Sequence, residues 1–406
     1  MTQVAPRIAY LLHRFPGNTD TFIKREIRAL IAAGTYVRVI SVWTPTGKET
    51  TEESLTEWRP LTSFLLPAKM KTASDILAFC FRHPGAFCAG AWLAAKTGKP
   101  GVKGGLMQIA YFLEAVLSAG IVRQQGFTHI HNHIGDQSGT VTMLAAKMAG
   151  VSYSITFHGW PVFFDAENAR VGEKVNRAVF TRSISYFCRS QLMLFARSRD
   201  PSRFKIVHCG IDIADYRFRT PRAEVKRLLC VARISYEKGL AFLIEAMDRL
   251  RGLGHHFELH LAGDGPDRAF LEELTKAKGL TDRVRFLGYL TEPQVRAELD
   301  AADVFILPSF VEGVPVSAME AMAVGVPVIA TNVGGTSELI EDGVSGLLIR
   351  PSDIDSLCDA IVRLETEPGL AQRIADAGRR TVVEEFDARK EFAKLNAYML
   401  EFGMIR

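Results

Sequence analysis

"DVFILPSFVEGVPVSAMEAMAVGVPVIAT", residues 303–331, holds an apolar helical segment between two short runs rich in β-branched residues. The runs at 303–308 and 327–331 are typical of buried strands, and the stretch between them is typical of a helix. A strand, a crossing helix and a second strand predict neighbouring parallel strands. This stretch therefore predicts an α/β domain with a doubly wound sheet.

Two carboxylates stand out in this apolar stretch. Glu312 comes just before the expected helix, and Glu320 lies about two turns into it. Pro315 fits the first helical turn, where its missing N–H costs nothing. The amides of Gly313 and Val314 would then be donors at the positive end of the helix, suited to phosphate or sugar oxygens. A carboxylate can bind the cis-diol of a ribose, whereas the alternative makes Glu320 a buried partner of an arginine and Glu312 a loop charge.

The same alternation of strand and helix extends over the chain. The expected strands are 7–12, 36–42, 128–133, 152–157 and 204–209 in the first half, and 227–232, 257–263, 283–288, 303–308, 327–331 and 346–349 in the second. A helix is expected from Asp20 as N-cap to a stop at Gly34, and residues 68–125 read as mostly helical. The domains are predicted as 1–208, a linker 209–226, a second domain 227–385, and a C-terminal helix 386–406 that packs back toward the first domain.

Charge is distributed unevenly. Residues 1–210 contain 25 Lys/Arg and 13 Asp/Glu, whereas the remainder contains 24 and 32. A basic half predicts an anionic partner, either nucleic acid or a phospholipid surface. No motif of a nucleic-acid reader is present, so a membrane surface is favoured over nucleic acid, with apolar residues 68–125 and their scattered Lys and Arg as the contact. The alternative makes residues 68–125 ordinary amphipathic core helices. The six cysteines show no ligand spacing, no apolar run is long enough to span a bilayer and no secretory signal is visible, which predicts a reduced, cytoplasmic protein.

The loop at 231–239, VARISYEKG, carries Arg233 and Lys238 directly after an expected strand. Ligands sit at this edge of open α/β sheets, and two cations there can clamp a diphosphate. The alternative is two solvated surface charges. Gly263 in LAGDGP lets the backbone approach a ligand, but no dinucleotide fingerprint follows. The DID at 353–355 is read as a helix N-cap rather than a metal site.

Taken in order, these motifs resemble retaining glycosyltransferases of family 4, and the first half most resembles exopolysaccharide and colanic-acid-type transferases. The resemblance spans essentially the whole chain and is weakest at 44–125. The first half contributes HRFPGNTDTFIKREIRAL (13–30), HIHNHIG (129–135), TFHG (156–159) and HCGID (208–212). The second half contributes VARISYEKG, LAGDGP, FLGYL (286–290), ADVFILPS and the Glu312–Glu320 pair.

The resemblance implies the GT-B architecture, in which two Rossmann-like, doubly wound α/β domains face each other across a cleft. Arg233 and Lys238 would hold the diphosphate of a nucleotide sugar. Glu320 would bind its ribose, and Glu312 would hold the donor sugar. The remaining implied roles are donor contacts by Gly17, Gly263, Gly313, Val314 and Pro315, a catalytic role for His158 near the sugar, and acceptor-side roles for Arg14, His131 and His133.

The implied reaction is hexose transfer from a nucleotide-diphosphate sugar to an acceptor hydroxyl by front-face attack, with no metal and no cofactor required. The expected acceptor is a lipid-linked oligosaccharide, and peripheral contact with an anionic membrane is expected alongside it. No nucleic acid is expected as a partner. Two alternatives stay open: an epimerase or sugar phosphorylase of the same architecture, and a non-catalytic glycan- or membrane-binding protein.

Overall fold

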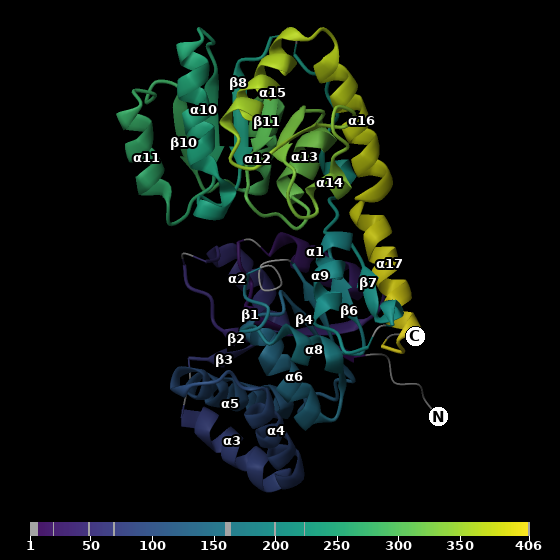
Figure 1. Ribbon diagram of the computed structural model, residues 1–406. Coiled ribbons are helices and arrows are strands. Elements are labelled where there is room, and N and C mark those ends of the chain that lie inside the picture. The colour runs from purple at the N-terminus through teal and green to yellow at the C-terminus, as the bar shows by residue number, and fades with distance from the viewer. Residues whose placement is uncertain are drawn as a thin grey trace. The chain divides into compact units, whose positions relative to one another are not determined.

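The computed structural model describes residues 7–18, 20–47, 49–67, 70–158, 164–198, 200–222 and 224–404. The chain divides into two compact units (Figure 1). Unit 1 comprises Met1–Val207 and Phe392–Arg406, and unit 2 comprises His208–Glu391. The segment expected as a linker, 209–226, contributes Ile211 and Tyr216 to the buried core of unit 2.

Unit 1 is built on a seven-stranded parallel sheet in the order β3-β2-β1-β4-β5-β6-β7. Its strands are β1 (Arg7–Arg14), β2 (Tyr36–Trp43), β3 (Thr62–Leu66), β4 (His129–His133), β5 (Ser152–Phe157), β6 (Thr181–Ser183) and β7 (Phe204–Ile206). Ile8 of β1 is in register with Val37 of β2 on one side and His129 of β4 on the other. The strand order therefore reverses direction between β1 and β4.

Helices cover both faces of this sheet and form two separate cores. One core includes α1 and the end of α17, since Leu395 and Met399 pack with Ile8 and Tyr10 of β1. The other includes α5 and α6. The helices are α1 (Thr21–Ala32), α2 (Glu52–Trp58), η1 (Arg59–Leu61), α3 (Met70–Arg82), α4 (Pro84–Thr97), α5 (Val102–Gln124), α6 (Gln137–Ala149), α8 (Val171–Arg177), α9 (Tyr186–Leu194), η2 (Pro201–Arg203) and α17 (Ala388–Glu401).

Unit 2 has a six-stranded parallel sheet in the order β10-β9-β8-β11-β12-β13. The strands are β8 (Arg227–Val231), β9 (Glu258–Ala262), β10 (Val284–Gly288), β11 (Val304–Leu307), β12 (Val328–Thr331) and β13 (Leu347–Ile349). The helices are η3 (Ile213–Asp215), η4 (Tyr236–Lys238), α10 (Leu240–Gly252), α11 (Arg268–Ala277), α12 (Glu292–Ala301), α13 (Val316–Val324), α14 (Thr336–Leu339), α15 (Ile354–Thr366) and α16 (Leu370–Glu385). All four residues of the central strand β11 are buried, as expected of a strand covered by helices on both faces.

The six strands predicted in the second half are confirmed, each within one residue or two of its expected limits. The helical interpretation of residues 68–125 is confirmed over the described part by α3, α4 and α5. Two strands of unit 1 were missed. β3 is a half-buried edge strand, and β6 is only three residues long with a charged residue at its centre, so neither carries a clear apolar pattern.

Three details of the prediction need correction. Pro315 is the N-cap residue of α13 rather than part of its first turn, because its ψ of 112° is extended. Glu320 is consequently the fifth residue of α13, about one turn inside it instead of two. α5 is long and apolar enough to cross a membrane, although no such segment was expected.

Candidate active site

The strand order of unit 2 brings the predicted donor-site loops to one edge of the sheet. β8 and β11 are neighbours at the point where the strand order reverses. The loop after β8 carries Arg233 and Lys238, and the loop after β11 carries Glu312. Ligands of open α/β sheets bind outside the carboxyl ends of the strands at such a point. The topology therefore places these residues where a ligand of this unit is expected.

Lys238 and Glu312 are in direct contact. The Lys238 Nζ atom lies 2.7 Å from Glu312 Oε1, and the two side chains are 21% and 10% exposed. The backbone holds the two loops together, because the amide of Phe310 donates to the Glu237 carbonyl at 2.8 Å. Gly239 follows with a φ of +63°, and a Cβ there would lie 2.2 Å from the Pro308 carbonyl oxygen. Only glycine permits this approach, which fixes Lys238 beside Glu312.

Glu312 is oriented by a further residue that the sequence analysis missed. The buried hydroxyl of Ser309 donates to Glu312 Oε1 at 2.6 Å. Lys238 and Ser309 thus share one carboxylate oxygen, and Oε2 accepts no hydrogen bond from the residues that the structure describes. The sequence held a signal for this contact, because a serine three residues before a carboxylate in one loop can bring its hydroxyl to that carboxylate. Oε2 is the Glu312 atom best placed to accept a hydroxyl of a ligand.

Arg233 is the exposed cation of this edge. Its guanidinium forms no ion pair or hydrogen bond within the described ranges of the chain. The loop that carries Arg233 is bound to the loop after β9, because the Ile234 amide donates to the Asp264 carbonyl at 3.1 Å. A Cβ on Gly263 would lie 1.9 Å from the Ala232 carbonyl oxygen. Gly263 therefore allows close approach of this loop, and its own amide donates to the Gly288 carbonyl at 2.8 Å rather than pointing to an open site.

One of the partners of Glu320 is a tyrosine. The Tyr216 hydroxyl donates to Glu320 Oε1 at 2.8 Å, and the tyrosine is buried. Tyr216 was missed because it lies in the segment expected as a linker. At the start of α13, the amides of Gly313 and Val314 donate no hydrogen bond to any residue in the part of the chain that is described. Their predicted role as donors to a ligand remains a prediction.

Unit 1 places its predicted residues at the carboxyl edge of its own sheet. Gly17 follows β1, and its amide donates to Asp20 Oδ2 at 2.6 Å, so this amide already has an intramolecular partner. The same contact shows why the Asp20 side chain does not cap α1. Arg14 forms an ion pair with Glu49 at the surface. These contacts give Gly17 and Arg14 structural partners, and their predicted ligand contacts remain predictions.

Three histidines lie close together at the ends of β4 and β5. The His133 Nδ1 atom lies 2.9 Å from His158 Nε2. His131 is fully buried, and its two ring nitrogens contact the hydroxyls of Ser154 and Thr156 at 2.7 and 3.0 Å. Burial lowers the pKa of His158 well below its usual value, and His133 and Arg182 act in the same direction. His158 is therefore neutral at physiological pH, and the contacts of His131 favour a structural role.

Glu26, His131 and His133 bring ligand atoms within 4.8 Å of one another, a grouping that a metal ion can use. Each of these atoms is already engaged. Glu26 also forms an ion pair with the buried Arg182, whose positive charge opposes a cation at this position. Asp353 of the DID sequence caps α15 by accepting from the Ser356 amide at 3.0 Å, as predicted. Neither set of side chains suits a metal ion.

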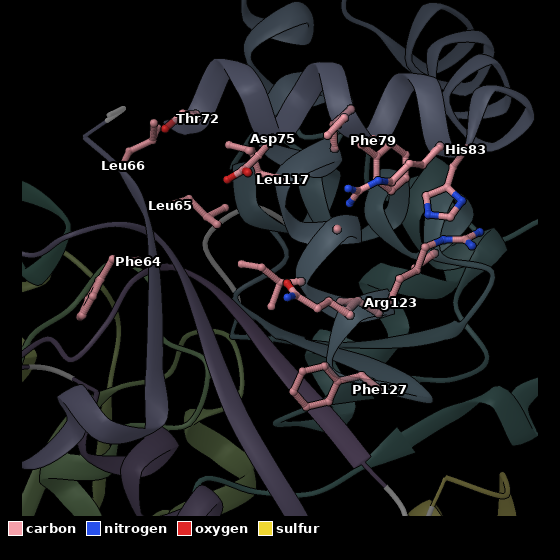
Figure 2. Close-up of a pocket in the computed structure, with 18 of the residues that line it drawn as sticks. Phe64, Leu65, Leu66, Thr72, Asp75, Phe79, His83, Leu117, Arg123 and Phe127 are labelled. Carbon is pink, nitrogen blue, oxygen red and sulfur yellow. The ribbon is translucent and has the colours of Figure 1, made fainter. Parts of the chain in front are cut away.

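Unit 1 also contains a groove of about 1230 Å³ that includes none of the predicted site residues. Figure 2 shows it between the edge strand β3 and the helices α3 and α5. Leu65, Leu66 and Phe79 form part of its apolar wall. Basic side chains also line it, namely Arg59, Arg82, His83 and Arg123, together with the acidic Asp75. The lining therefore combines apolar and charged side chains.

Residues 212–381 match the family model "Glycosyl transferases group 1". A glycogen synthase of Mycobacterium tuberculosis is 34% identical over 45% of this chain, although the match spans only 44% of that protein. TuaC of Bacillus subtilis, a glycosyltransferase assigned to teichuronic acid biosynthesis, is 31% identical over 66% of this chain and 69% of its own. WcaL of Salmonella typhimurium, assigned to colanic acid biosynthesis, is 26% identical over 94% of this chain and 96% of its own.

Solved structures with the same fold cover nearly the whole chain. HepE of Anabaena, in complex with UDP and glucose, superposes with a TM-score of 0.72 at 19% identity and covers 97% of this chain and 100% of its own. The sucrose-phosphate synthase of Thermosynechococcus elongatus has a TM-score of 0.75 at 20% identity and covers 97% and 98%. With the two doubly wound sheets, this likeness confirms the predicted fold class.

Proposed function

The chain belongs to the group 1 glycosyl transferases, and from this premise we propose that it transfers a hexose from a nucleotide-diphosphate sugar to an acceptor hydroxyl with retention of configuration. The observation that carries the proposal is the contact between Lys238 and Glu312 at the reversal point of the unit 2 sheet. It joins a cation suited to phosphate and a carboxylate suited to sugar hydroxyls in one place. The presence of UDP and glucose on HepE, which has the same fold, supports this choice of ligand class.

In this proposal the two cations act on the leaving group. Arg233 approaches the diphosphate from the exposed side, and Lys238 reaches it with the ammonium protons that Glu312 does not bind. Glu312 Oε2 accepts a hydroxyl of the donor sugar, and Glu320, held by Tyr216, accepts from the ribose.

The acceptor oxygen attacks the anomeric carbon from the face that the phosphate leaves. The bond between that carbon and the phosphate oxygen breaks, and the bond to the acceptor oxygen forms. The acceptor's proton passes to the departing phosphate oxygen, so no enzymic nucleophile is needed. Positioning and the stabilisation of charge on the leaving group then supply the catalysis. Neither a metal nor a cofactor takes part in this mechanism.

We also propose that the acceptor is lipid-linked and that unit 1 contacts an anionic membrane from the cytoplasmic side. A stripe of apolar side chains at helical spacing is exposed on α5, namely Val102, Leu106, Ile109 and Leu113. On α4, Trp92 is 62% exposed, and the Lys96 ammonium lies over its ring. Lys99 lies between the two helices in sequence, and Lys103 is the second residue of α5. Apolar residues beside lysines match an anionic lipid surface, and the groove of Figure 2 offers room for a lipid chain.

Because residues of the other α5 face belong to the core of unit 1, the proposal has this helix lying on the bilayer rather than crossing it. The assignment of WcaL to colanic acid synthesis and of TuaC to teichuronic acid synthesis supports an envelope or capsular glycan as the product.

The test begins with a thermal-shift panel of UDP, GDP and ADP sugars, since a ligand at 100 times its Kd adds about 2.7 kcal/mol of apparent stability. The sugar that binds is then assayed for transfer with and without acceptor, and with EDTA. We expect acceptor-dependent transfer that survives EDTA and falls about 10²–10³-fold in R233A. If the assay without acceptor yields epimerised or phosphorolysed sugar, the protein belongs to one of the other two enzyme classes. If no nucleotide sugar raises the melting temperature, the remaining interpretation is a non-catalytic glycan- or membrane-binding protein.

A second experiment addresses the membrane contact. Sedimentation with vesicles containing phosphatidylglycerol should carry down the wild-type protein at low salt. The W92A/L106A variant should remain in the supernatant, whereas K276A, which removes an exposed lysine of unit 2, should behave as wild type. Failure of the wild type to bind anionic vesicles would refute the membrane proposal without affecting the transferase proposal.

A further inference from the structure

The groove of Figure 2 extends along the β3 edge of the unit 1 sheet, from one end of the strands to the other. Its lining includes Thr44 and Pro67, which follow the carboxyl ends of β2 and β3. It also includes Phe127 and Val151, which come shortly before the amino ends of β4 and β5. The groove therefore has a carboxyl end and an amino end, and α3 and α5 line it between them.

The charged side chains of the groove are separated by sign. Asp75 lies in the first half of α3, toward the carboxyl end, because α3 follows β3 in the chain. Arg82 is the last residue of α3, Arg123 is the last but one of α5, and Arg59 comes shortly before β3. These three arginines therefore belong to the amino end. Figure 2 shows Asp75 at one side of the groove and His83 with Arg123 at the other.

None of the three arginines is paired with a carboxylate in the part of the chain that is described. Arg59 and Arg82 also form no side-chain hydrogen bond with any described residue. Arg123 is held by the Met148 carbonyl, which accepts from its Nε and Nη2 atoms at 3.0 and 2.8 Å, and these bonds leave Nη1 for a ligand. Guanidinium groups without an anionic partner at one end of a groove suit a phosphate, which accepts several N–H donors at once.

Between its ends the groove is lined by apolar side chains. Leu65 of β3, Phe79 of α3 and Val116 of α5 belong to this part, and all three are buried. Gly120 of α5 keeps the space open, because the nearest atom to a Cβ placed there is 3.9 Å away, on Phe79. The volume of about 1230 Å³ exceeds the range of about 300–1,000 Å³ that is typical of pockets for drug-sized ligands. These features favour a long apolar chain as the ligand of the central part.

The surface beside the groove indicates where such a ligand comes from. Leu77 and Phe81 of α3 are 59% and 82% exposed, and neither lines the groove. Phe81 directly precedes Arg82, so an exposed apolar side chain adjoins a cation of the amino end. Exposed apolar side chains next to cations are typical of a surface that contacts anionic lipid. This favours a membrane lipid over a peptide or a nucleotide from solution.

We propose that the groove binds one anionic phospholipid, with its phosphate at the arginines of the amino end and an acyl chain along α5. This lipid site rests on the membrane contact of the proposed function but not on the transfer reaction. The lipid differs from the acceptor. A phosphate at the amino ends of the strands would direct an attached glycan away from the carboxyl ends, where ligands of open α/β sheets bind.

The experiment uses the full-length protein and lipids that stay monomeric in water, so that the groove is measured apart from the membrane surface. Dihexanoyl phosphatidylglycerol is titrated below its critical micelle concentration, and binding is followed by isothermal titration and by the melting temperature, which a bound ligand raises. We expect saturable binding to the wild type. Dihexanoyl phosphatidylcholine should bind more weakly, because its choline cation opposes the arginines. Glycerol 3-phosphate, which lacks an acyl chain, should give no shift at the same concentration.

One variant tests the place of the acyl chain. G120L adds a side chain that projects from α5 into the groove, and it should abolish the binding of both lipids. A leucine at this helical position is no threat to folding, since leucine favours a helix more than glycine does. G105L is the matched control, because Gly105 belongs to the same helix, has open space around it and lies outside the groove. G105L should bind both lipids as the wild type does.

A second variant tests the place of the phosphate. R59Q/R82Q removes two exposed cations, and we expect the Kd of phosphatidylglycerol to rise about tenfold, the effect of losing one hydrogen bond to a charged group. K147Q is the control, because Lys147 is an exposed cation of α6 outside the groove. K147Q should leave the Kd of phosphatidylglycerol unchanged.

Several results would overturn the lipid site: no binding of either lipid, equal binding of both by the wild type, or unchanged binding in G120L. A shift with glycerol 3-phosphate as large as that with phosphatidylglycerol would also overturn it, since the acyl chain would then be irrelevant. W92A/L106A should bind the monomeric lipid as the wild type does, because neither residue lines the groove. The titrations contain no sugar nucleotide, so a failure of the transferase proposal would appear in the sugar panel and not here.

Discussion

Lys238 and Glu312 meet in the described structure although separate ligand groups were predicted for them. Each side chain therefore occupies a hydrogen-bonding position of the other before a donor binds. The ion pair compensates the lysine charge, and the approach of a diphosphate has to compete with Glu312 for the ammonium protons. The pair lies largely away from water, where such competition is stronger than at an exposed surface.

Opposite effects on binding and turnover should follow in two variants. In E312Q the lysine charge is no longer compensated, so the Kd of the preferred nucleoside diphosphate should fall severalfold while turnover is lost with the sugar contact. In K238M both affinity and turnover should decrease. Isothermal titration and a transfer assay measure the two quantities. E237Q removes a negative charge from the same turn without touching Lys238 and serves as the control. Weaker diphosphate binding in E312Q would contradict this account.

At the scale of elements, the site depends on how tightly two loops pack at the sheet edge. In G239A a methyl group would meet the Pro308 carbonyl, and alanine is also strained at a φ of +63°. We expect a loss of about 1–3 kcal/mol in the free energy of unfolding and a strong loss of turnover, because the turn moves away from Glu312. Gly254 has a φ of +90° and open space around it. G254A should thus lose stability by strain alone and keep full activity, as urea titration and the transfer assay can show.

The DID sequence provides a second prediction at this scale. Asp353 caps α15, so D353A should lower the free energy of unfolding by about 1 kcal/mol. Turnover should stay unchanged in the presence and absence of Mn²⁺. The D355A variant, which alters the neighbouring exposed carboxylate, is the control and should affect neither property strongly. A variant with normal stability but no activity would mean that Asp353 binds a metal.

The inner strands β11 and β12 of unit 2 were predictable because they are buried on both faces and read as continuous apolar runs, as in VFIL of β11. β6 was not predictable. Its three residues, TRS, place Arg182 in the interior, where the distant Glu26 compensates its charge. The same reason hid the contacts of His133 with Glu26 and His158, since these residues come from separate elements and no spacing in the sequence connects them. Loop positions such as Arg233 and Lys238 were found because they follow strands at the edge where parallel sheets bind ligands.

At the scale of the whole molecule, the buried histidines are distributed unequally. His129, His131 and His158 of unit 1 are kept neutral by burial, which lowers the pKa of His129 to about 3 and those of the other two well below the usual value. In the described part of unit 2 the buried histidines are His208 and His260, and His260 Nδ1 lies 2.9 Å from a carboxylate oxygen of Glu298. The two units should therefore respond differently to mild acid.

The direction of the stability change with pH follows from the number of protons that the folded and unfolded states bind. In the unfolded chain these histidines bind protons near pH 6.5, whereas the folded unit 1 does not, so the unfolded state gains protons as the pH falls. Each histidine then removes about 1.4 kcal/mol of stability per pH unit below 6.5. Glu26 adds to the loss only below about pH 4.5, where the unfolded chain binds its proton. Unit 1 should be acid-labile in a range in which unit 2 is not.

Hydrogen exchange followed by mass spectrometry at pH 7.0 and 5.5, corrected for intrinsic exchange rates, can test this difference. Protection of β4 and β5 should decrease markedly at the lower pH, whereas that of β8 and β11 should hold. His129 offers a quantitative check, because its ring nitrogens contact Ser152 and Ser154, each at 2.8 Å, and bind no ligand in the proposed mechanism. H129N should be less stable at pH 7 but should lose stability with a slope smaller by about 1.4 kcal/mol per pH unit. An equal loss of protection in both units, or an unchanged slope in H129N, would show that buried histidines do not set the acid sensitivity of unit 1.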